Sequence, residues 1–126
     1  MKHLFLVFIG GGTGSVLRYY LSNLLQGYFN VAFPFGTLGV NILACFVLGL
    51  VAGTLDSAIT LSPASRLLLI TGFCGGLSTF SAFSYESLRL MQEEKYIYLA
   101  TYVIASIVLC TGFTFAGIAV ASRITY

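Results

Sequence analysis

A short segment of the chain mixes phenylalanines with hydroxyl side chains, over residues 78–84 (STFSAFS). If the segment is helical, Phe80 and Phe83 share a face, and Ser84 and Ser87 continue it. Aromatic ring edges carry partial positive charge and hydroxyls donate hydrogen bonds, so together they can replace part of an anion's hydration shell. Two phenylalanines alone usually indicate packing. The combination gives the moderate attraction that ion conduction requires, without a fixed cation to trap the anion.

Polar side chains also recur one helical turn apart in two other apolar segments. Thr37 and Asn41 project from one face of the first, and the Asn41 amide supplies two donors and an acceptor. Tyr102, Ser106 and Cys110 form a similar stripe in the second. Hydrogen bonds between membrane helices and core packing are the ordinary explanations of such stripes. A partly dehydrated anion would need the same donors, most clearly Asn41.

Two charged residues, Arg18 and Glu86, lie inside apolar segments, where a charge is costly unless it reaches water or a partner. Arg18 either extends to the membrane interface or supplies positive charge to a water-filled vestibule that attracts anions. Glu86 is either a gate for protons or anions, or an interfacial carboxylate that pairs with Arg89 at i+3. The sequence alone leaves both pairs of alternatives open.

The remaining residues argue against several function classes. No histidine or buried carboxylate is placed to activate a serine, so we do not expect an enzyme. The only histidine is His3, at the terminus, which argues against haem. Cys45, Cys74 and Cys110 are separated in apolar sequence and are interpreted as small apolar filler. The glycines of residues 10–14 lack the spacing and the lysine of a phosphate-binding loop, and indicate close helix packing instead.

The composition places these residues in a membrane. Of 126 residues, 58% are hydrophobic and 8% are charged, with a mean hydropathy of +0.96. A soluble domain is about 25% charged. Six basic and four acidic side chains are too few to cover the surface of so short a soluble protein, and a net charge of +2 does not suggest nucleic-acid binding. We predict a single membrane domain over residues 1–126.

Four segments are long and apolar enough to cross a bilayer, whose core of about 30 Å needs about 20 helical residues. We expect helices over about residues 4–25, 36–55, 63–92 and 96–122. Asp56 ends the second helix. Ser62 and Pro63 start the third, because Ser caps a helix and Pro fits its first turn. The predicted fold class is an all-α integral membrane protein with four transmembrane helices.

The third predicted helix is unusual in its length and its glycines. Its 30 or so residues would extend about 45 Å, more than a bilayer core requires. Residues 72–79 (GFCGGLST), near its middle, form a poor helix interior. We therefore predict a break there. Backbone groups freed at that depth must face protein, water or an ion, so a broken helix points to a site.

Loop charges give little bias to the orientation in the membrane. With both termini on one side, Lys2, Arg66 and Arg123 lie there, and Arg89 and Lys95 lie on the other. Orientation follows a clear asymmetry of basic residues, which is absent here. The chain either inserts with a weak preference or inserts both ways, and the second option permits an antiparallel homodimer.

These residues resemble those of the small bacterial fluoride ion channels, the Fluc or CrcB-like family. The resemblance covers essentially the whole chain in length and in the order of its helices. It rests on Gly10 through Arg18, on residues 36–41 (GTLGVN) and above all on residues 72–86 (GFCGGLSTFSAFSYE). One departure is Ala82, where some relatives have threonine, so this chain lacks a hydroxyl beside the phenylalanines.

The resemblance implies a passive, fluoride-selective channel that exports fluoride from the cytoplasm and relieves fluoride toxicity. It implies a location in the cell inner membrane of a bacterium. It also implies an antiparallel, dual-topology homodimer with two pores, which agrees with the weak charge bias. A structural sodium ion would lie at the dimer interface, bound by the backbone carbonyls of Gly75 and Ser78 from both subunits.

The resemblance also implies roles for particular side chains. Asn41, Phe80 and Phe83 match residues that line the fluoride pore. Arg18 matches an arginine near the vestibule, and we place Glu86 at the vestibule with it. The polar track would be extended by Ser81, Thr37, Tyr102 and Ser106.

Two alternatives belong to other classes. A small dual-topology, proton-coupled exporter would need a carboxylate within the membrane, and the first two predicted helices contain none before Asp56. A non-transporting membrane anchor or assembly subunit would explain the composition, but it would leave residues 78–84 and the broken helix without a role.

Overall fold

The computed structural model describes residues 1–55 and 61–125, which form helices joined by short connections. The helices are α1 (Lys2–Phe29), α2 (Phe35–Leu55), α3 (Pro63–Arg66), the π-helical η1 (Leu67–Cys74), α4 (Gly75–Leu77), α5 (Phe80–Gln92) and α6 (Tyr96–Thr125). Four stretches are long and apolar enough to cross a membrane: Lys2–Phe29, Phe35–Thr54, Pro63–Gln92 and Tyr96–Ile124. The four predicted membrane helices are therefore confirmed. Asp56, predicted to end the second, lies outside the described residues.

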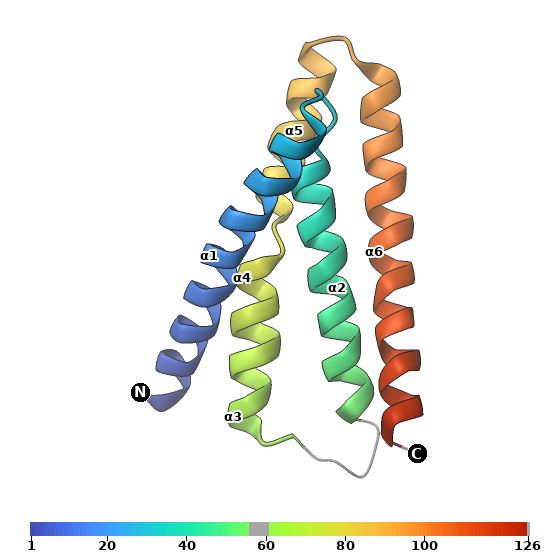
Figure 1. The fold of residues 1–126 in the computed structure, drawn as a ribbon. Coiled ribbons are helices and arrows are strands. Elements are labelled where there is room, and N and C mark those ends of the chain that lie inside the picture. Colours follow the sequence, from blue (N-terminus) through green and yellow to red (C-terminus); the bar gives the residue numbers. More distant parts are fainter. Residues whose placement is uncertain (56–60, 126) are drawn as a thin grey trace.

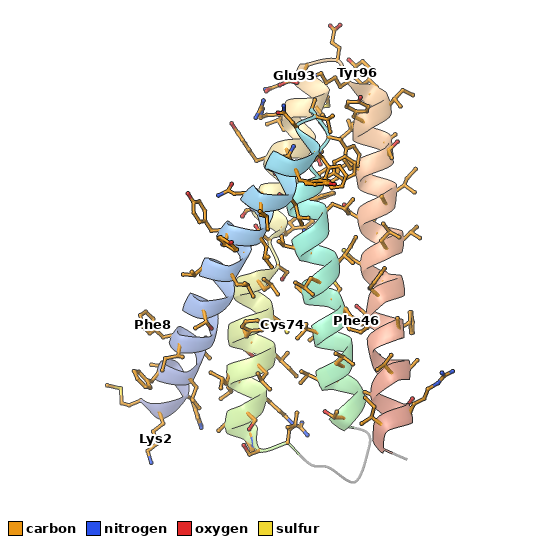
Figure 2. All side chains as sticks on the ribbon, viewed as in Figure 1. Lys2, Phe8, Phe46, Cys74, Glu93 and Tyr96 are labelled. Carbon is orange, nitrogen blue, oxygen red and sulfur yellow. The ribbon has the colours of Figure 1, made fainter. Side chains whose placement is uncertain are left out.

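The four membrane segments alternate in direction, and both termini lie at the same end of the bundle (Figure 1). Lys2 marks that end, and Glu93 and Tyr96 mark the opposite end, at the turn between α5 and α6 (Figure 2). The third membrane segment consists of α3, η1, α4 and α5 in succession. Each segment packs against a neighbour in sequence or one segment removed.

Local signals in the sequence account for the helix ends. α1 runs one turn further than predicted, and Asn30 ends it in the left-handed conformation (φ 43°, ψ 44°). The Gln26 side chain then donates to the Val31 carbonyl at 2.8 Å and accepts from the Gly36 N–H at 3.2 Å. At the start of α3, the Ser62 hydroxyl accepts from the Ser65 N–H at 3.1 Å, which is the predicted cap.

Glycines let α1 lie directly against the backbone of the third membrane segment. A Cβ atom at Gly10 would overlap the carbonyl oxygen of Leu68, and one at Gly14 would overlap that of Phe73. A carbonyl oxygen fixed in a helix cannot move aside as a flexible side chain can. The predicted role of the glycines of residues 10–14 in helix packing is therefore confirmed at these two positions.

α2 and α6 run in the same direction, side by side along their length (Figure 1). Gly49 of α2 lies against Thr114 of α6, and one turn further along Gly53 lies against Ile118. Successive turns of α2 therefore meet successive turns of α6. The same register places the two predicted polar stripes opposite each other in the first half of both helices.

The third membrane segment breaks immediately after Leu77. Ser78 (φ −82°, ψ 156°) and Thr79 (φ −149°, ψ 116°) have extended backbones, and α5 begins at Phe80. The predicted break is confirmed, but the glycines do not cause it. Gly72, Gly75 and Gly76 all stay helical, and the missing side chains of Gly72 and Gly76 allow close packing on α1.

Candidate ion pathway at the helix break

One side chain, the Asn41 amide of α2, holds the break in the third membrane segment. Its Oδ1 accepts from the Thr79 N–H at 2.8 Å, and its Nδ2 donates to the Thr79 carbonyl at 3.2 Å. The Thr79 hydroxyl in turn accepts from the Ala82 N–H at 3.2 Å and so caps α5. Backbone groups that a helix would have paired are thus paired by side chains, as membrane depth requires.

A cavity of about 270 Å³ lies beside the break, between α2, α5 and α6. Four predicted pore residues line it: Asn41, Phe80, Phe83 and Ser106. The others that line it are Cys45, Ser78, Thr79, Ile107 and Cys110. Within the described part of the chain, no charged side chain lines this cavity. Residues from three separate helices therefore meet in one uncharged space.

The two phenylalanines form a pair on the α5 side of the cavity. Their ring centroids are 5.5 Å apart, with an angle of 36° between the ring planes. Phe83 also contacts the ring of Tyr102, at 5.1 Å, which ties it to α6. Phe80 is 77% exposed in the single chain. On the inner side of the cavity, Phe83 is therefore held by its contact with Tyr102. On the other side, where Phe80 is exposed, the cavity is open to the surroundings of the chain.

Ser106, which lines this cavity, carries a hydroxyl that the described residues leave unpaired in its wall. Its Oγ is buried and, among the described residues, has no hydrogen-bond partner. A buried hydroxyl without a partner costs about 1–3 kcal/mol. Asn41 has a further donor to offer, because its pairing with Thr79 uses one of its two amide hydrogens. The cavity thus combines donors with aromatic rings and carries no fixed charge.

Glu86 is held inside the bundle, one turn from the cavity. Its Oε1 accepts from the Thr37 hydroxyl and its Oε2 from the Tyr102 hydroxyl, both at 2.6 Å. The proposed interfacial pair with Arg89 is wrong, because Arg89 contacts Glu93 instead, at 3.0 Å. Thr37 and Tyr102 are almost fully buried, at 6% and 0% exposure. They position the Glu86 carboxylate and do not line the cavity.

A second cavity, of about 440 Å³, opens at the end of the bundle near the α5–α6 turn. It is lined by Glu86 together with Gln26, Arg89, Glu93 and Lys95. Glu86 therefore touches this outer cavity and, through Thr37 and Tyr102, the turn next to the inner one. Thr37 lies one turn before Asn41 in α2 and Tyr102 one turn before Ser106 in α6, and Asn41 and Ser106 line the inner cavity.

Arg18 lies on the opposite side of the break. Its Nε donates to the Gly76 carbonyl at 3.0 Å, and the Ser15 hydroxyl contacts the same oxygen at 3.4 Å. This position at the end of α4 places a cation where helix carbonyls are left unpaired. Arg18 lines neither of the two cavities. The guanidinium is therefore anchored at the break and does not extend to the interface.

Ser81, Gly75 and Ser78 take different positions around the break. Ser81 is exposed and its hydroxyl lies 3.2 Å from that of Thr79, outside the cavity. The Thr79 N–H would reach the Gly75 carbonyl in an unbroken helix, but it bonds Asn41 instead. Across residues 1–55 and 61–125, no three His, Cys, Asp or Glu side chains gather where they could hold a metal ion.

The sequence interpretation missed two features of this site. Thr79 is the residue whose backbone Asn41 recognises. Cys45 and Cys110, interpreted as separate filler, line the same cavity from α2 and α6. The signal available in the sequence was a polar stripe at four-residue spacing in each of α2 and α6. That the two stripes face the same cavity can be inferred only when the register of α2 on α6 is known.

Comparisons with known proteins agree with this arrangement. The family model described as "CrcB-like protein, Camphor Resistance (CrcB)" matches residues 5–118. A Pyrococcus furiosus protein named "Fluoride-specific ion channel FluC" is 46% identical over 123 residues, 98% of each chain. Relatives of the same name from Phocaeicola vulgatus and Aquifex aeolicus are 50% and 42% identical, covering 86% and 93% of this chain and 89% and 94% of their own. The chain belongs to the CrcB-like family.

Proposed function

We propose that this chain forms a passive channel that conducts fluoride across the cell membrane. The observation that carries the proposal is the uncharged cavity at the break, where the buried Ser106 hydroxyl, the Asn41 amide and two phenylalanine rings converge. The name shared by the relatives from P. furiosus, P. vulgatus and A. aeolicus supports fluoride as the ion. The four membrane segments support transport across a bilayer.

Fluoride is a small anion that binds its hydration water tightly, so a pore must replace those hydrogen bonds. In the cavity, the Ser106 hydroxyl and the second amide hydrogen of Asn41 are donors for this purpose. The positive edges of Phe80 and Phe83 add weaker attraction. Because no cation lines the cavity, the ion is attracted without being held, as conduction requires.

The proposed path leads from this cavity past Glu86 to the outer cavity. A carboxylate repels an anion, but Thr37 and Tyr102 both donate to Glu86 and so spread part of its charge. Arg89 and Lys95 line the outer cavity together with Glu86 and Glu93, so its charged side chains balance, and both basic groups pair with Glu93. Ser81 and Arg18 lie outside both cavities, so we assign them to the surface that meets the second subunit or the vestibule.

The proposal includes an antiparallel, dual-topology homodimer. Phe80 is exposed at membrane depth, so a pore at this position needs a second wall. A second chain inserted the other way would supply it, and the weak bias of the loop charges permits both insertions. A sodium ion at the interface would be bound by the carbonyls of Gly75 and Ser78 from both subunits. The Gly75 carbonyl has lost the N–H of Thr79 to Asn41, and carbonyl oxygens suit a hard cation.

The cellular setting remains part of the proposal. Export of fluoride from the cytoplasm, with relief of toxicity, follows from passive conduction when fluoride is more concentrated inside. The relatives include archaeal proteins from Pyrococcus as well as proteins from bacteria. The prediction of a bacterial inner membrane is therefore narrower than the range of organisms in which relatives occur. We propose a cell membrane as the location.

One observation favours the proton-coupled exporter, the second candidate. Glu86 is a partly buried carboxylate within the third membrane segment, which is the residue type that such an exporter needs. The two functions differ in their energy source. A channel passes fluoride down its own gradient, whereas a coupled exporter requires a proton gradient.

The experiment is fluoride efflux from liposomes containing the purified protein, measured with a fluoride electrode at equal pH on both sides. Chloride-loaded vesicles measured with a chloride electrode are the matched control. We expect rapid fluoride release and no chloride release above that of empty vesicles. No fluoride release from folded, reconstituted protein would contradict the proposal.

A further inference from the structure

A buried phenylalanine lies outside the helices, in the connection between α1 and α2. Phe33 is 9% exposed and belongs to the same buried cluster as Tyr102 of α6. It lines neither the inner nor the outer cavity. Connecting segments usually run over the surface of a protein, so the burial of this ring calls for an explanation.

The ring of Phe33 stands edge-on to that of Tyr102. The two ring centroids are 5.7 Å apart, and the ring planes make an angle of 79°. This is one of the two arrangements that aromatic pairs prefer. The Tyr102 ring also contacts Phe83, at 5.1 Å. It therefore touches both a residue of the connection and a residue that lines the inner cavity.

Tyr102 joins two parts of the proposed fluoride path. Its ring contacts Phe83, and its hydroxyl donates to Glu86 Oε2 at 2.6 Å. Because the ring and the hydroxyl oxygen of tyrosine form one rigid plane, a tilt of the ring changes both contacts at once. Whatever sets the angle of the Tyr102 ring therefore sets Phe83 and Glu86 together.

The connection that carries Phe33 is itself held by a side chain of α1. Gln26 Nε2 donates to the Phe33 carbonyl at 3.2 Å and to the Val31 carbonyl at 2.8 Å. Gln26 Oε1 accepts from the Gly36 N–H at 3.2 Å. One amide thus pairs with three backbone groups, and it fixes the backbone from which the Phe33 ring extends.

We propose that Phe33 is a positioning residue for Tyr102 and that Gln26 holds it in place. Through Tyr102, Phe33 sets the positions of Phe83 and Glu86, which border the inner and the outer cavity. The proposal therefore rests on the proposed function. A large ring is needed at this position, because a smaller side chain leaves space into which the Tyr102 ring tilts.

Phe33→Leu removes the ring that contacts Tyr102. Its matched control is Phe113→Leu, which removes an edge-on contact of the same kind, with Phe46 at 6.3 Å. Neither Phe46 nor Phe113 lines the inner cavity. The two variants therefore lose a similar aromatic contact, and only the first loses it at Tyr102.

Gln26→Met is the second variant, and it leaves the Phe33 ring in the chain. It removes the three hydrogen bonds of the amide and keeps the length, the lack of charge and the helix propensity of the side chain. Gln92→Met, at an exposed position at the end of α5, is its matched control. No substitution in the set adds a charge, so none acts on fluoride through electrostatic repulsion.

The direct test is fluorine NMR of the full-length protein in fluoride-free buffer, with para-fluorophenylalanine at position 83 as the only label. Packing against Tyr102 sets the position of its resonance. We expect the resonance to shift or broaden in Phe33→Leu, to change less in Gln26→Met, and to stay the same in both control variants. An unchanged resonance in Phe33→Leu, or an equal change in Phe113→Leu, would overturn the proposal.

Fluoride efflux from liposomes tests the consequence, on the unlabelled proteins. The worth of one aromatic pair corresponds to roughly a two- to tenfold change in rate, and we expect Phe33→Leu to be slower within this range. Gln26→Met should be slowed less, and the two control variants should match the wild type. A wild-type rate in Phe33→Leu would contradict the proposal. If the wild type itself releases no fluoride, the proposed function fails, while the NMR measurement still decides whether Phe33 positions Phe83.

Discussion

The two halves of the third membrane segment meet the rest of the protein in opposite ways. Before the break, η1 and α4 touch α1 backbone to backbone, through glycines whose Cβ atoms would overlap carbonyl oxygens. After the break, α5 touches α2 and α6 through side chains, among them Phe83, Tyr102 and Glu86. The first contact leaves no room for chemistry, and the second encloses a cavity lined by polar groups.

This difference separates what holds the protein together from what it does. Close backbone packing is a source of stability for membrane helices, which gain nothing from exclusion of water. The α5 side carries a buried hydroxyl that has no partner among the described residues and a carboxylate within the membrane, which are costly features. Costly groups are retained where a function needs them. Substitutions on the two sides should therefore have opposite effects on stability and flux.

The largest effect is expected at the glycine contact. In Gly14→Ala, the new Cβ meets the Phe73 carbonyl oxygen, so α1 must move away from the third segment. We expect a loss of about 3 kcal/mol or more in the free energy of unfolding, at the upper end for an overpacked site. Unfolding in mixed micelles measures it. Gly12→Ala is the control, because among the described residues nothing beyond the adjacent backbone of α1 lies within 4 Å of its Cβ; equal losses would contradict backbone packing.

The next effect is on flux, at the aromatic pair. Phe80→Leu keeps an apolar side chain at a position that is 77% exposed, so the fold should be retained. The ring edge is lost, and we expect fluoride efflux at least about tenfold slower, equivalent to about 1.4 kcal/mol in the barrier. Phe5→Leu, also exposed but on α1, should leave the rate unchanged. An unaltered rate in Phe80→Leu would favour a membrane anchor with no pore.

A smaller effect is expected at Ser106, where a substitution should raise stability and lower the fluoride flux. Ser106→Ala removes a buried hydroxyl that has no partner among the described residues, so the free energy of unfolding should rise by about 1 kcal/mol. Fluoride efflux should fall severalfold, because a donor is lost from the cavity. The same two measurements on Thr101→Ala, at an exposed position of α6, provide the reference. Lower stability in Ser106→Ala would show that the hydroxyl serves the fold.

The smallest effect is expected outside the membrane, at Glu93. Hydrogen bonds from Lys95 and Arg89 hold the pKa of the Glu93 carboxyl below its usual value. Its contribution to stability is therefore present above the usual pKa of glutamate and is lost as the pH falls through the lowered pKa. Because the carboxylate is exposed to solvent, the change is small. In the wild type, part of the fall in unfolding temperature between pH 7 and pH 3 should come from this carboxyl. That part should be absent in Glu93→Gln, while fluoride efflux at pH 7 stays the same.

Features that depend on one segment could be predicted from the sequence. The four membrane helices follow from apolar length, and the cap at Ser62 follows from its local pattern. The break was predicted from the glycines, which are poor helix formers. It lies after them, because Asn41 binds the Thr79 backbone from another helix. A contact between residues 38 positions apart leaves no local signal.

Features that depend on the register of two helices could not be predicted. The stripes of α2 and α6 were visible in the sequence, but their alignment was not. That alignment brings the Thr37 and Tyr102 hydroxyls to the two carboxylate oxygens of Glu86, and it places Cys45 and Cys110 on the same cavity. Asn41, Phe80, Phe83 and Ser106, for which the resemblance implied a place in the pore, all line the inner cavity, and their part in conduction stays a prediction. The resemblance did not distinguish them from Ser81, which lies outside.

The most direct test of the central claim is the reversal potential of currents through the protein in a planar bilayer, with fluoride salt on one side and chloride salt on the other. The measurement is repeated with a pH difference across the bilayer. A passive fluoride channel reverses at the equilibrium potential of fluoride, and the pH difference does not move it. A reversal potential that follows the proton gradient, or one near zero with equal fluoride and chloride concentrations, would contradict the account.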